Sequence, residues 1–355
     1  MSTLKLLTPG PVCLHPEARR VLAAPQLHHR SEEASEQIAE ARTNIAKMAG
    51  SSGEALILTG SGTAAMEALL RAFFAPGETV WVPVAGKFSQ RWMEIARSAG
   101  LKVLQSEFTW GESVPLESVP TGIDGALLTH SETSTGVLHD LRGLAERVKQ
   151  ANPGARVLAD AITSFMLTHL AMDDWRIDGV AIGSQKGLMS PPGIAFAVIS
   201  KKHLSGLRSS GYYLDLAREM AQQKKQQTAF TPAINLIAAV AAVSRQYQSK
   251  EALSKHLRHK EQANKEIYRV GESYGLQPVP KGVAARSPAT AAFYLPKGLT
   301  PAKISRAMLE RGWRIAGGQG PLKGKTIRLS AMGYLREDEL AKALEDFSQV
   351  LADHL

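Results

Sequence analysis

Short hydrophobic runs alternate with segments of helical periodicity in the first part of the chain, up to residue 199. The hydrophobic runs predict seven buried strands, at residues 55–58, 79–82, 102–104, 125–128, 156–159, 179–182 and 194–199. Apolar residues spaced three and four apart predict helices at 16–24, 31–49, 63–74, 87–99 and 140–150. Buried strands that alternate with helices are typical of an α/β fold, with a mostly parallel sheet covered on both faces.

The pattern changes after Ser200. Polar helices are expected at 202–209 and 214–227, an apolar helix opens at 231–235, and a long charged helix follows at 250–274. Strands at 290–295, 313–315 and 326–329, with helices at 301–311 and 337–351, then predict a smaller α+β unit. We therefore expect an N-terminal segment at 1–15, a large α/β domain at 16–248 and a small C-terminal α+β domain at 249–355.

Composition narrows the possible partners and compartments. The 355 residues carry a formal net charge of +9, which could indicate nucleic-acid binding or a preference for small anions. The densest basic segments, 224–225 and 255–260, are not interleaved with aromatic residues for base stacking, so no nucleic-acid partner is expected. The single cysteine, Cys13, excludes an internal disulfide and suits a reducing cytoplasm. The N-terminus lacks signal-peptide features, and the longest apolar run, 234–243, is too short to span a bilayer, so no membrane partner is expected.

Lys186 stands out among the candidate functional residues. It follows the strand at 179–182, in a loop of small residues that Pro191, Pro192 and Gly193 make stiff. A lysine held at a strand end can be partly desolvated, which lowers its proton affinity and makes it a nucleophile toward carbonyl carbon. The alternative is an ordinary solvated loop lysine, which is far commoner for a lysine taken at random.

Other strand ends carry residues suited to a ligand. Residues 59–63 are small and polar and lead into a helix, so backbone N–H groups and the helix dipole there favour an anion. Asp160 closes the strand at 156–159 and lies 26 residues before Lys186, so the two strand ends could be neighbours. It could equally cap the start of a following helix. The loop at 130–136, which includes Thr133, is dense in hydroxyl groups, as both a polar site and a simple turn would be.

Two residues would complete such a site. Phe88 opens the helix at 87–99 and could stack on a heteroaromatic ring or pack in the core. Arg328 interrupts an apolar strand, where a substrate carboxylate would be a suitable partner. Pyridoxal phosphate requires a lysine, a carboxylate for its ring nitrogen, an anion site and a flat group beside its ring. The residues therefore point to this cofactor, and the sequence predicts no metal site.

The chain resembles the class V aminotransferases of fold-type I, within the pyridoxal phosphate enzymes. It is most similar to the branch of alanine–glyoxylate and serine–pyruvate aminotransferases. The matching motifs are Thr8-Pro-Gly-Pro11, Gly60-Ser-Gly-Thr63, Ser131-Glu-Thr-Ser-Thr-Gly136, Asp160, Gly183-Ser-Gln-Lys186 with Pro191-Pro-Gly193, and Arg328 with Met332-Gly333. They follow the family order and cover nearly the whole chain.

The resemblance implies a large domain with a seven-stranded sheet, an N-terminal segment near the active site, and a homodimer with each site at the subunit interface. It implies cofactor contacts from Ser61, Gly62, Thr63, Phe88, Thr133 and Gln185, with Thr231 reaching the site of the neighbouring subunit. It implies substrate contacts from Gly10 and Arg328. The chain departs from many relatives at 226–228, where they have a tyrosine, and at Phe88, which is often tryptophan in close relatives.

The resemblance also implies a reaction. Lys186 would hold the cofactor covalently and then move the substrate Cα proton, while Asp160 keeps the cofactor ring nitrogen protonated. The expected donor is alanine, serine or a similar small L-amino acid, with glyoxylate or pyruvate as acceptor. Phosphoserine, aspartate or aminoethylphosphonate is the alternative, because His28, His29 and Arg30 could bind a second anionic group or form a surface turn. A lyase reaction is less expected, and a cysteine desulfurase is rejected because Cys13 is the only thiol and lies early in the chain.

Overall fold

The computed structural model describes residues 4–354, and its largest feature is a seven-stranded sheet with the strand order β2-β10-β9-β8-β5-β3-β4. Strand β10 runs antiparallel to both of its neighbours, and every other pair in this sheet is parallel. The mostly parallel sheet expected from the sequence is therefore confirmed. Its strands are β2 (Glu54–Thr59), β3 (Thr79–Val84), β4 (Lys102–Glu107), β5 (Gly125–Thr129), β8 (Arg156–Asp160), β9 (Gly179–Gly183) and β10 (Ile194–Ile199).

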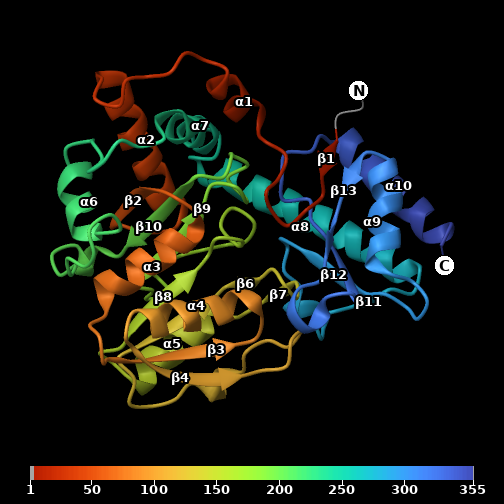
Figure 1. Cartoon of the computed structure of the whole chain (residues 1–355), viewed down its shortest axis with the longest axis horizontal. Coiled ribbons are helices and arrows are strands. Elements are labelled where there is room, and N and C mark those ends of the chain that lie inside the picture. The colour runs from red at the N-terminus through yellow and green to blue at the C-terminus, as the bar shows by residue number, and fades with distance from the viewer. Residues whose placement is uncertain (1–3, 355) are drawn as a thin grey trace.

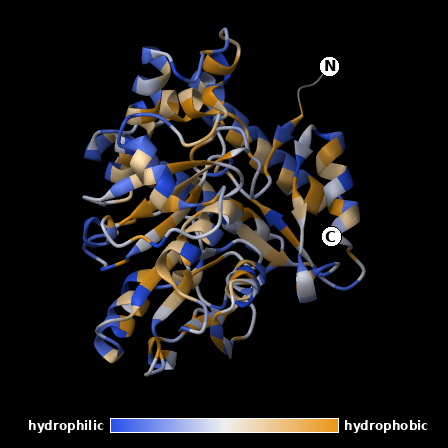
Figure 2. Ribbon diagram, turned by 60° about the vertical axis from the view of Figure 1, so that its left-hand side comes forward, coloured by the Kyte–Doolittle hydropathy of each residue, from blue (hydrophilic) through white to orange (hydrophobic). Residues whose placement is uncertain are grey.

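Helices cover both faces of this sheet, because successive side chains of each buried strand point to opposite faces. Along β2, Ile57 joins one hydrophobic cluster while Leu56 and Leu58 join the other. Helices α2 (Glu32–Met48), α5 (Leu141–Ala151) and α7 (Ile234–Arg245) pack on the first face. Helices α3 (Gly62–Phe73), α4 (Lys87–Ser98) and α6 (Leu216–Gln223) pack on the second. Figure 2 shows largely hydrophobic strands between helices whose residues alternate in hydropathy.

One edge of the sheet gathers the ends of the central strands. Asp160 at the end of β8 is in register with Ala181 of the parallel strand β9. Because β10 returns antiparallel, its first residue Ile194 pairs with Thr59 at the end of β2. The β9–β10 connection, which contains Lys186, therefore lies at the same edge as Asp160 and the start of α3.

A second, four-stranded antiparallel sheet is built from the C-terminal part of the chain, in the order β11-β12-β15-β14. Its strands are β11 (Gln277–Pro278), β12 (Ala291–Tyr294), β14 (Ala316–Gly317) and β15 (Thr326–Leu329). Helices α8 (Lys250–Ser273), α9 (Pro301–Glu310) and α10 (Glu337–Ala352) share a hydrophobic cluster with it. The exact division into segments 1–15, 16–248 and 249–355 stays a prediction.

The N-terminal segment lies against this C-terminal part, as Figure 1 shows. Strand β1 (Lys5–Leu6) pairs in parallel with β13 (Trp313–Arg314), so the strand expected at 313–315 pairs outside the four-stranded sheet. Helix α1 (Pro16–Leu22) then leads into the larger sheet unit. None of the described helices combines the length and the apolar character needed to cross a bilayer.

Two predicted helices differ from the structure. The helix expected at 202–209 is wrong, because only a short 3-10 turn, η2 (Lys201–His203), forms there. The helix expected at 214–227 is shorter, since the Asp215 side chain caps the N–H of Arg218 and fixes the start of α6. Gln226 adopts a φ of 58°, which lies beyond the end of this helix. The sequence analysis also missed a hairpin of two-residue strands, β6 (Ser131–Glu132) and β7 (Val137–Leu138), which are too short to show a period.

Candidate active site

Lys186 is held in a loop that is closed by its own backbone hydrogen bonds. Ser190 N donates to Ser184 O over 3.1 Å, and Met189 N donates to Lys186 O over 2.8 Å. The Lys186 side chain is only 8% exposed, and its Nζ donates to the carbonyl oxygen of Pro9. Gly10 has a φ of +98°, which favours glycine, and a Cβ there would lie 2.6 Å from the present position of Lys186 Cε. The N-terminal segment therefore covers the amine.

A cavity of about 280 Å³ opens beside Lys186, at the carboxyl edge of the central strands. This volume is near the lower end of the range for small-molecule sites, which is roughly 300–1,000 Å³. The lining brings together most of the residues singled out in the sequence, with others that were not: Gly10, Pro11, Ser61, Gly62, Thr63, Phe88, Arg91, Asp160, Ile162, Thr163, Gln185, Lys186 and Pro192.

The amine of Lys186 is shifted toward its neutral form. Burial is the main cause, and the positive charge of Arg328 acts in the same direction, while Asp160 opposes both. Together these effects lower the pKa of Lys186 from 10.5 to about 8. A neutral amine at near-neutral pH can attack a carbonyl carbon or accept a proton from carbon.

The carboxyl group of Asp160 is shifted in the complementary direction. Burial raises the pKa of Asp160 from 3.8 to about 6, although its hydrogen bond from Ile162 N, over 2.8 Å, favours the charged form. The negative charge of Glu132 raises this pKa further. Asp160 is 5% exposed and borders the cavity. A positively charged N–H group at that position would relieve its desolvation.

The start of helix α3 forms an anion cradle in the cavity wall. Ser61 is its N-cap residue, and the Ser61 side chain makes no capping hydrogen bond. The first N–H groups of a helix lack intrahelical partners and carry partial positive charge. A Cβ at Gly62 would lie 2.4 Å from Ile162 Cδ1, so glycine keeps the backbone close to the cavity wall. Gln185 also lines the cavity, and the N–H groups of its side-chain amide can donate hydrogen bonds to an anion. These groups fit a bound phosphate.

Phe88 and Arg91 line the cavity together from the first turns of α4. The guanidinium carbon of Arg91 lies 4.9 Å from the centroid of the Phe88 ring, and Arg91 Nη1 donates to Thr63 Oγ1 over 3.3 Å. Within residues 4–354, Arg91 forms no ion pair with a carboxylate. The sequence analysis missed Arg91, although its position three residues after Phe88 places both on one helix face.

Glu132 stands in the motif at 131–136, but the sequence analysis assigned it no role. It is fully buried, and its carboxylate accepts hydrogen bonds from the backbone N–H groups of Phe88 and Ser89, over 3.1 Å and 3.0 Å. The hydroxyl of Ser134 donates to the same carboxylate over 2.6 Å. A carboxylate at the start of a helix satisfies orphan N–H groups and interacts favourably with the helix dipole. Glu132 therefore fixes the helix turn that presents Phe88.

Two further predicted site residues, Arg328 and Thr133, do not line the cavity, although the charge of Arg328 acts on Lys186. Arg328 Nε donates to Gly317 O over 2.9 Å, and its Nη1 donates to Thr133 O over 3.0 Å. Burial lowers the pKa of Arg328 to about 10, although Glu132 favours the charged form, so the guanidinium is charged at neutral pH. The Thr133 hydroxyl is 2.7 Å from that of Thr163, which lines the cavity in its place.

Three candidate residues lie away from this cavity within one chain. His29 and Arg30 are near the segment at 226–228, where Arg30 Nη1 donates to Gln227 Oε1 over 2.6 Å. Thr231 is exposed and does not line the cavity. The structure of a single chain therefore does not bring His29, Arg30 or Thr231 to Lys186.

Asp160→Asn tests the charge balance of the cavity. Because the pKa of Asp160 is higher in the folded protein, protonation of this carboxyl group stabilises the fold. This stabilisation is fully present below pH 3.8 and is lost as the pH rises through about 6. We expect the cofactor-free variant to be more stable than the cofactor-free wild type at pH 8, by about 1–3 kcal/mol, and equally stable at pH 4. Thermal melts between these pH values measure the difference, with Asp174→Asn on the surface as the matched control. A stability difference that does not change with pH would contradict this account of Asp160.

Comparisons with known proteins agree with this geometry. The sequence model of the family described as aminotransferase class-V matches residues 17–342. The aspartate aminotransferase of subgroup IV from Thermus thermophilus has 50% sequence identity to this chain and a TM-score of 0.96. The match covers 99% of this chain and 100% of the Thermus thermophilus chain. An alanine–glyoxylate aminotransferase from Nostoc sp. has 26% identity and a TM-score of 0.89, covering 99% and 96%. The small subunit of a soluble hydrogenase from Synechococcus sp. is 32% identical, covering 98% of this chain and 93% of that protein.

The cavity accommodates the groups of pyridoxal phosphate. The start of α3 with Gln185 suits its phosphate, the ring of Phe88 its pyridine ring, Asp160 its ring nitrogen, and Lys186 its aldehyde. The family match, the solved structures and this fit lead to one conclusion: the chain belongs to the class V aminotransferase family, and it is a pyridoxal phosphate-dependent transaminase.

Proposed function

We propose that this transaminase moves the amino group of a small L-amino acid, such as alanine or serine, to a small 2-oxo acid, such as glyoxylate or pyruvate. The observation that carries the proposal is the buried amine of Lys186, which lies beside Asp160 in a cavity with an anion cradle. The modest volume of about 280 Å³ supports small substrates, because the cofactor takes up much of it. The Nostoc relative, named for alanine and glyoxylate, supports the same choice.

The proposed chemistry assigns a role to each residue. When bound, pyridoxal phosphate supplies an aldehyde that amines attack and a ring that delocalises negative charge from the substrate Cα. Lys186 would hold the cofactor, and its amine, once free, would take the proton from the substrate Cα and deliver it to the former aldehyde carbon of the cofactor. With a pKa of about 8, Lys186 is neutral in roughly a tenth of molecules at pH 7. Asp160, as a carboxylate, accepts a hydrogen bond from the cofactor ring nitrogen and keeps it protonated.

Arg328 is the proposed site for the substrate α-carboxylate. A guanidinium has five N–H donors, and the hydrogen bonds to Gly317 and Thr133 occupy only two of the nitrogens. These two hydrogen bonds orient the plane of the Arg328 guanidinium. Its remaining N–H donors match the two oxygen atoms of a carboxylate. Gly10, which lines the cavity beside the Lys186 side chain, is the second proposed substrate contact.

Aspartate is a second candidate donor, favoured by the 50% identity to the Thermus thermophilus aspartate aminotransferase. Its second carboxylate needs a further cation. Arg91 lines the cavity, but it lies beside Thr63 at the anion cradle. Arg30 and His29 would serve if a neighbouring subunit brought them to this site, and phosphoserine or aminoethylphosphonate would require the same arrangement.

We also propose a homodimer that joins two sites. Tyr212 and Tyr213 are 69% and 48% exposed, and their rings lie 5.6 Å and 5.2 Å from that of Phe230. An exposed cluster of aromatic residues is typical of a protein interface. Thr231 is the next residue after Phe230, so an interface on this cluster would carry Thr231 to the neighbouring subunit.

The name of the Synechococcus relative suggests a redox activity, which we do not propose. Iron–sulfur clusters are held mainly by several cysteine thiolates, and this chain has one cysteine. Within residues 4–354, no group of three or more His, Cys, Asp or Glu side chains is placed to hold a metal ion. The cytoplasmic location expected from cysteine usage stays a prediction.

A donor panel tests the proposed reaction. We expect wild-type holoenzyme to transfer the amino group of alanine or serine to glyoxylate or pyruvate, as measured by product formation. Lys186→Ala should lower kcat by at least about 10³-fold, because no other described amine lines the cavity near Asp160. Lys255→Ala, on the exposed face of α8, is the matched control and should retain wild-type activity. Wild-type turnover by the Lys186 variant would contradict the assignment.

The same panel separates the two donor classes. If aspartate is the better donor, Arg30→Ala should lower kcat/KM for aspartate by about tenfold or more and leave that for alanine unchanged. If the donor is small and uncharged, Arg30→Ala should leave both values within twofold of the wild type. The alanine and serine proposal fails if only aspartate reacts.

Tyr212→Glu tests the homodimer. A buried charge in the aromatic cluster should shift the assembly from twice the 38.2 kDa chain mass toward the monomer and weaken cofactor binding. Analytical ultracentrifugation and cofactor titration measure these two changes. Leu309→Glu, at an exposed hydrophobic residue of α9 that is 40% exposed, is the matched control. A wild-type monomer, or a variant that remains dimeric with full cofactor affinity, would overturn this interface.

A further inference from the structure

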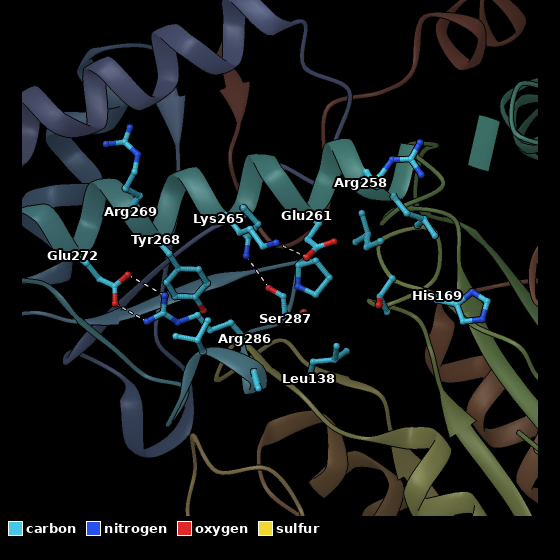
Figure 3. Close-up of a pocket in the computed structure, with 17 residues that line it drawn as sticks. Leu138, His169, Arg258, Glu261, Lys265, Tyr268, Arg269, Glu272, Arg286 and Ser287 are labelled. Carbon is cyan, nitrogen blue, oxygen red and sulfur yellow. Dashed lines mark hydrogen bonds and ion pairs between the residues drawn. The ribbon is translucent and has the colours of Figure 1, made fainter. Parts of the chain in front are cut away.

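A larger cavity, of about 740 Å³, lies apart from the site of Lys186. No residue lines both cavities. Figure 3 shows helix α8 along one side of the larger cavity, with Leu138 and Ser287 on the side that faces it. Its volume is within the range of about 300–1,000 Å³ that is usual for sites of small organic ligands.

One face of α8 forms the longest wall. Leu257, Glu261, Asn264, Tyr268 and Glu272 follow one another at intervals of three and four residues, so they lie along a single face of the helix. The opposite wall combines the end of β7 with two loops, at 167–169 and 283–288. The cavity therefore lies between two elements of the C-terminal part, α8 and the loop at 283–288, and two of the larger sheet unit, β7 and the loop at 167–169.

Much of the lining is apolar. Leu138, Leu257 and Pro288 are partly exposed there and contribute hydrophobic surface, and Val283 is 73% exposed. A concave surface that leaves such side chains in water is typical of a site that an apolar group covers.

The charged residues of the lining leave one cation without a partner. Lys265 pairs with Glu261 over 2.6 Å, and Arg286 pairs with Glu272 over 2.5 Å. Figure 3 shows the Arg286–Glu272 pair at one end of the cavity, and Arg258 with His169 toward the other end. Within the part of the chain that the structure describes, no carboxylate or other acceptor pairs with the Arg258 guanidinium.

A buried amide adds a polar group to the same wall. Asn264 is 2% exposed, and its Nδ2 donates to Ser287 O over 2.7 Å. Its Oδ1 has no hydrogen-bond partner among residues 4–354. An unsatisfied buried acceptor costs free energy that a donor on a bound molecule recovers.

We propose that this cavity, between α8 and the loops at 167–169 and 283–288, binds a small organic anion with an apolar body. The anionic group pairs with the Arg258 guanidinium, and the apolar body covers Leu138, Leu257 and Val283. The charge of the ligand follows from the one unpaired cation, and its apolar character follows from the rest of the lining.

The test uses two fluorescent probes of nearly the same shape on the holoenzyme, with cofactor saturating the site of Lys186. One is 1-anilinonaphthalene-8-sulfonate, an anion, and the other is N-phenyl-1-naphthylamine, which lacks the sulfonate. We expect wild-type protein to bind one sulfonate probe per chain and to bind it at least tenfold more tightly than the neutral probe.

Three variants locate the site. Arg258→Ala should weaken binding of the sulfonate probe by about tenfold and leave that of the neutral probe within twofold, because only the charge partner is removed. Ala284→Trp should weaken both probes, because it fills the cavity. Arg306→Ala removes a cation on α9 whose side chain is 83% exposed, and it should change neither. Transaminase activity and melting temperature verify the fold of each variant.

Binding of several sulfonate probes per chain, or no binding, would overturn the proposal. An equal loss of affinity for the sulfonate probe in Arg258→Ala and Arg306→Ala would also overturn it, because that result would show only a general attraction of the anion to surface charge. If Ala284→Trp fails to fold, the comparison of Arg258→Ala with Arg306→Ala decides alone, since both arginine side chains are on the surface.

Discussion

The burial of one amine is the constraint on which the site depends. An ammonium group in a cavity shielded from water is costly unless it is paired, so it shifts toward the neutral form. Lys186 is in this situation, because Pro9 and Gly10 cover it and Arg328 adds a repelling charge. Asp160 offsets the effect only in part, and its own pKa rises to about 6. The lowered pKa of Lys186 favours a nucleophilic amine. The raised pKa of Asp160 means that a positively charged ring nitrogen beside it would stabilise its carboxylate form.

The strand order explains why these groups meet. Parallel β8 and β9 end side by side, and antiparallel β10 returns the chain to β2, so Lys186, Asp160 and the start of α3 share one edge. Glu132 then fixes the start of α4 and raises the pKa of Asp160, while it favours the charged form of Arg328. One buried carboxylate thereby connects Phe88, Asp160 and Arg328, the three residues that we propose for the cofactor ring, its nitrogen and the substrate carboxylate.

Sequence patterns predicted the sheet, because buried strands form continuous apolar runs, and they singled out Lys186 and Asp160, because strand ends are visible in those runs. They did not predict Glu132, whose role depends on a contact with residues more than forty positions away. The helix expected at 202–209 does not form, because the segment packs in an irregular conformation. Leu204 and Leu207 pack against the second hydrophobic cluster, and Arg208 N donates to Ala72 O over 3.0 Å instead of to a carbonyl one turn earlier. His29 and Arg30 do not line the cavity of their own chain, so their proposed role depends on a second subunit, which no pattern along one chain encodes.

The two cavities differ in what defines them: a desolvated amine defines one, and an unpaired surface cation with apolar walls defines the other. One hydrogen bond connects their surroundings, because the hydroxyl of Ser287, which lines the larger cavity, lies 2.7 Å from that of Ser131, the residue before Glu132. The central claim concerns the smaller cavity and is tested by reducing the holoenzyme with borohydride and mapping its peptides. The account predicts that the cofactor-derived mass is on Lys186 and that Lys186→Ala carries none. A label on any other residue, or an unlabelled wild type, would contradict it.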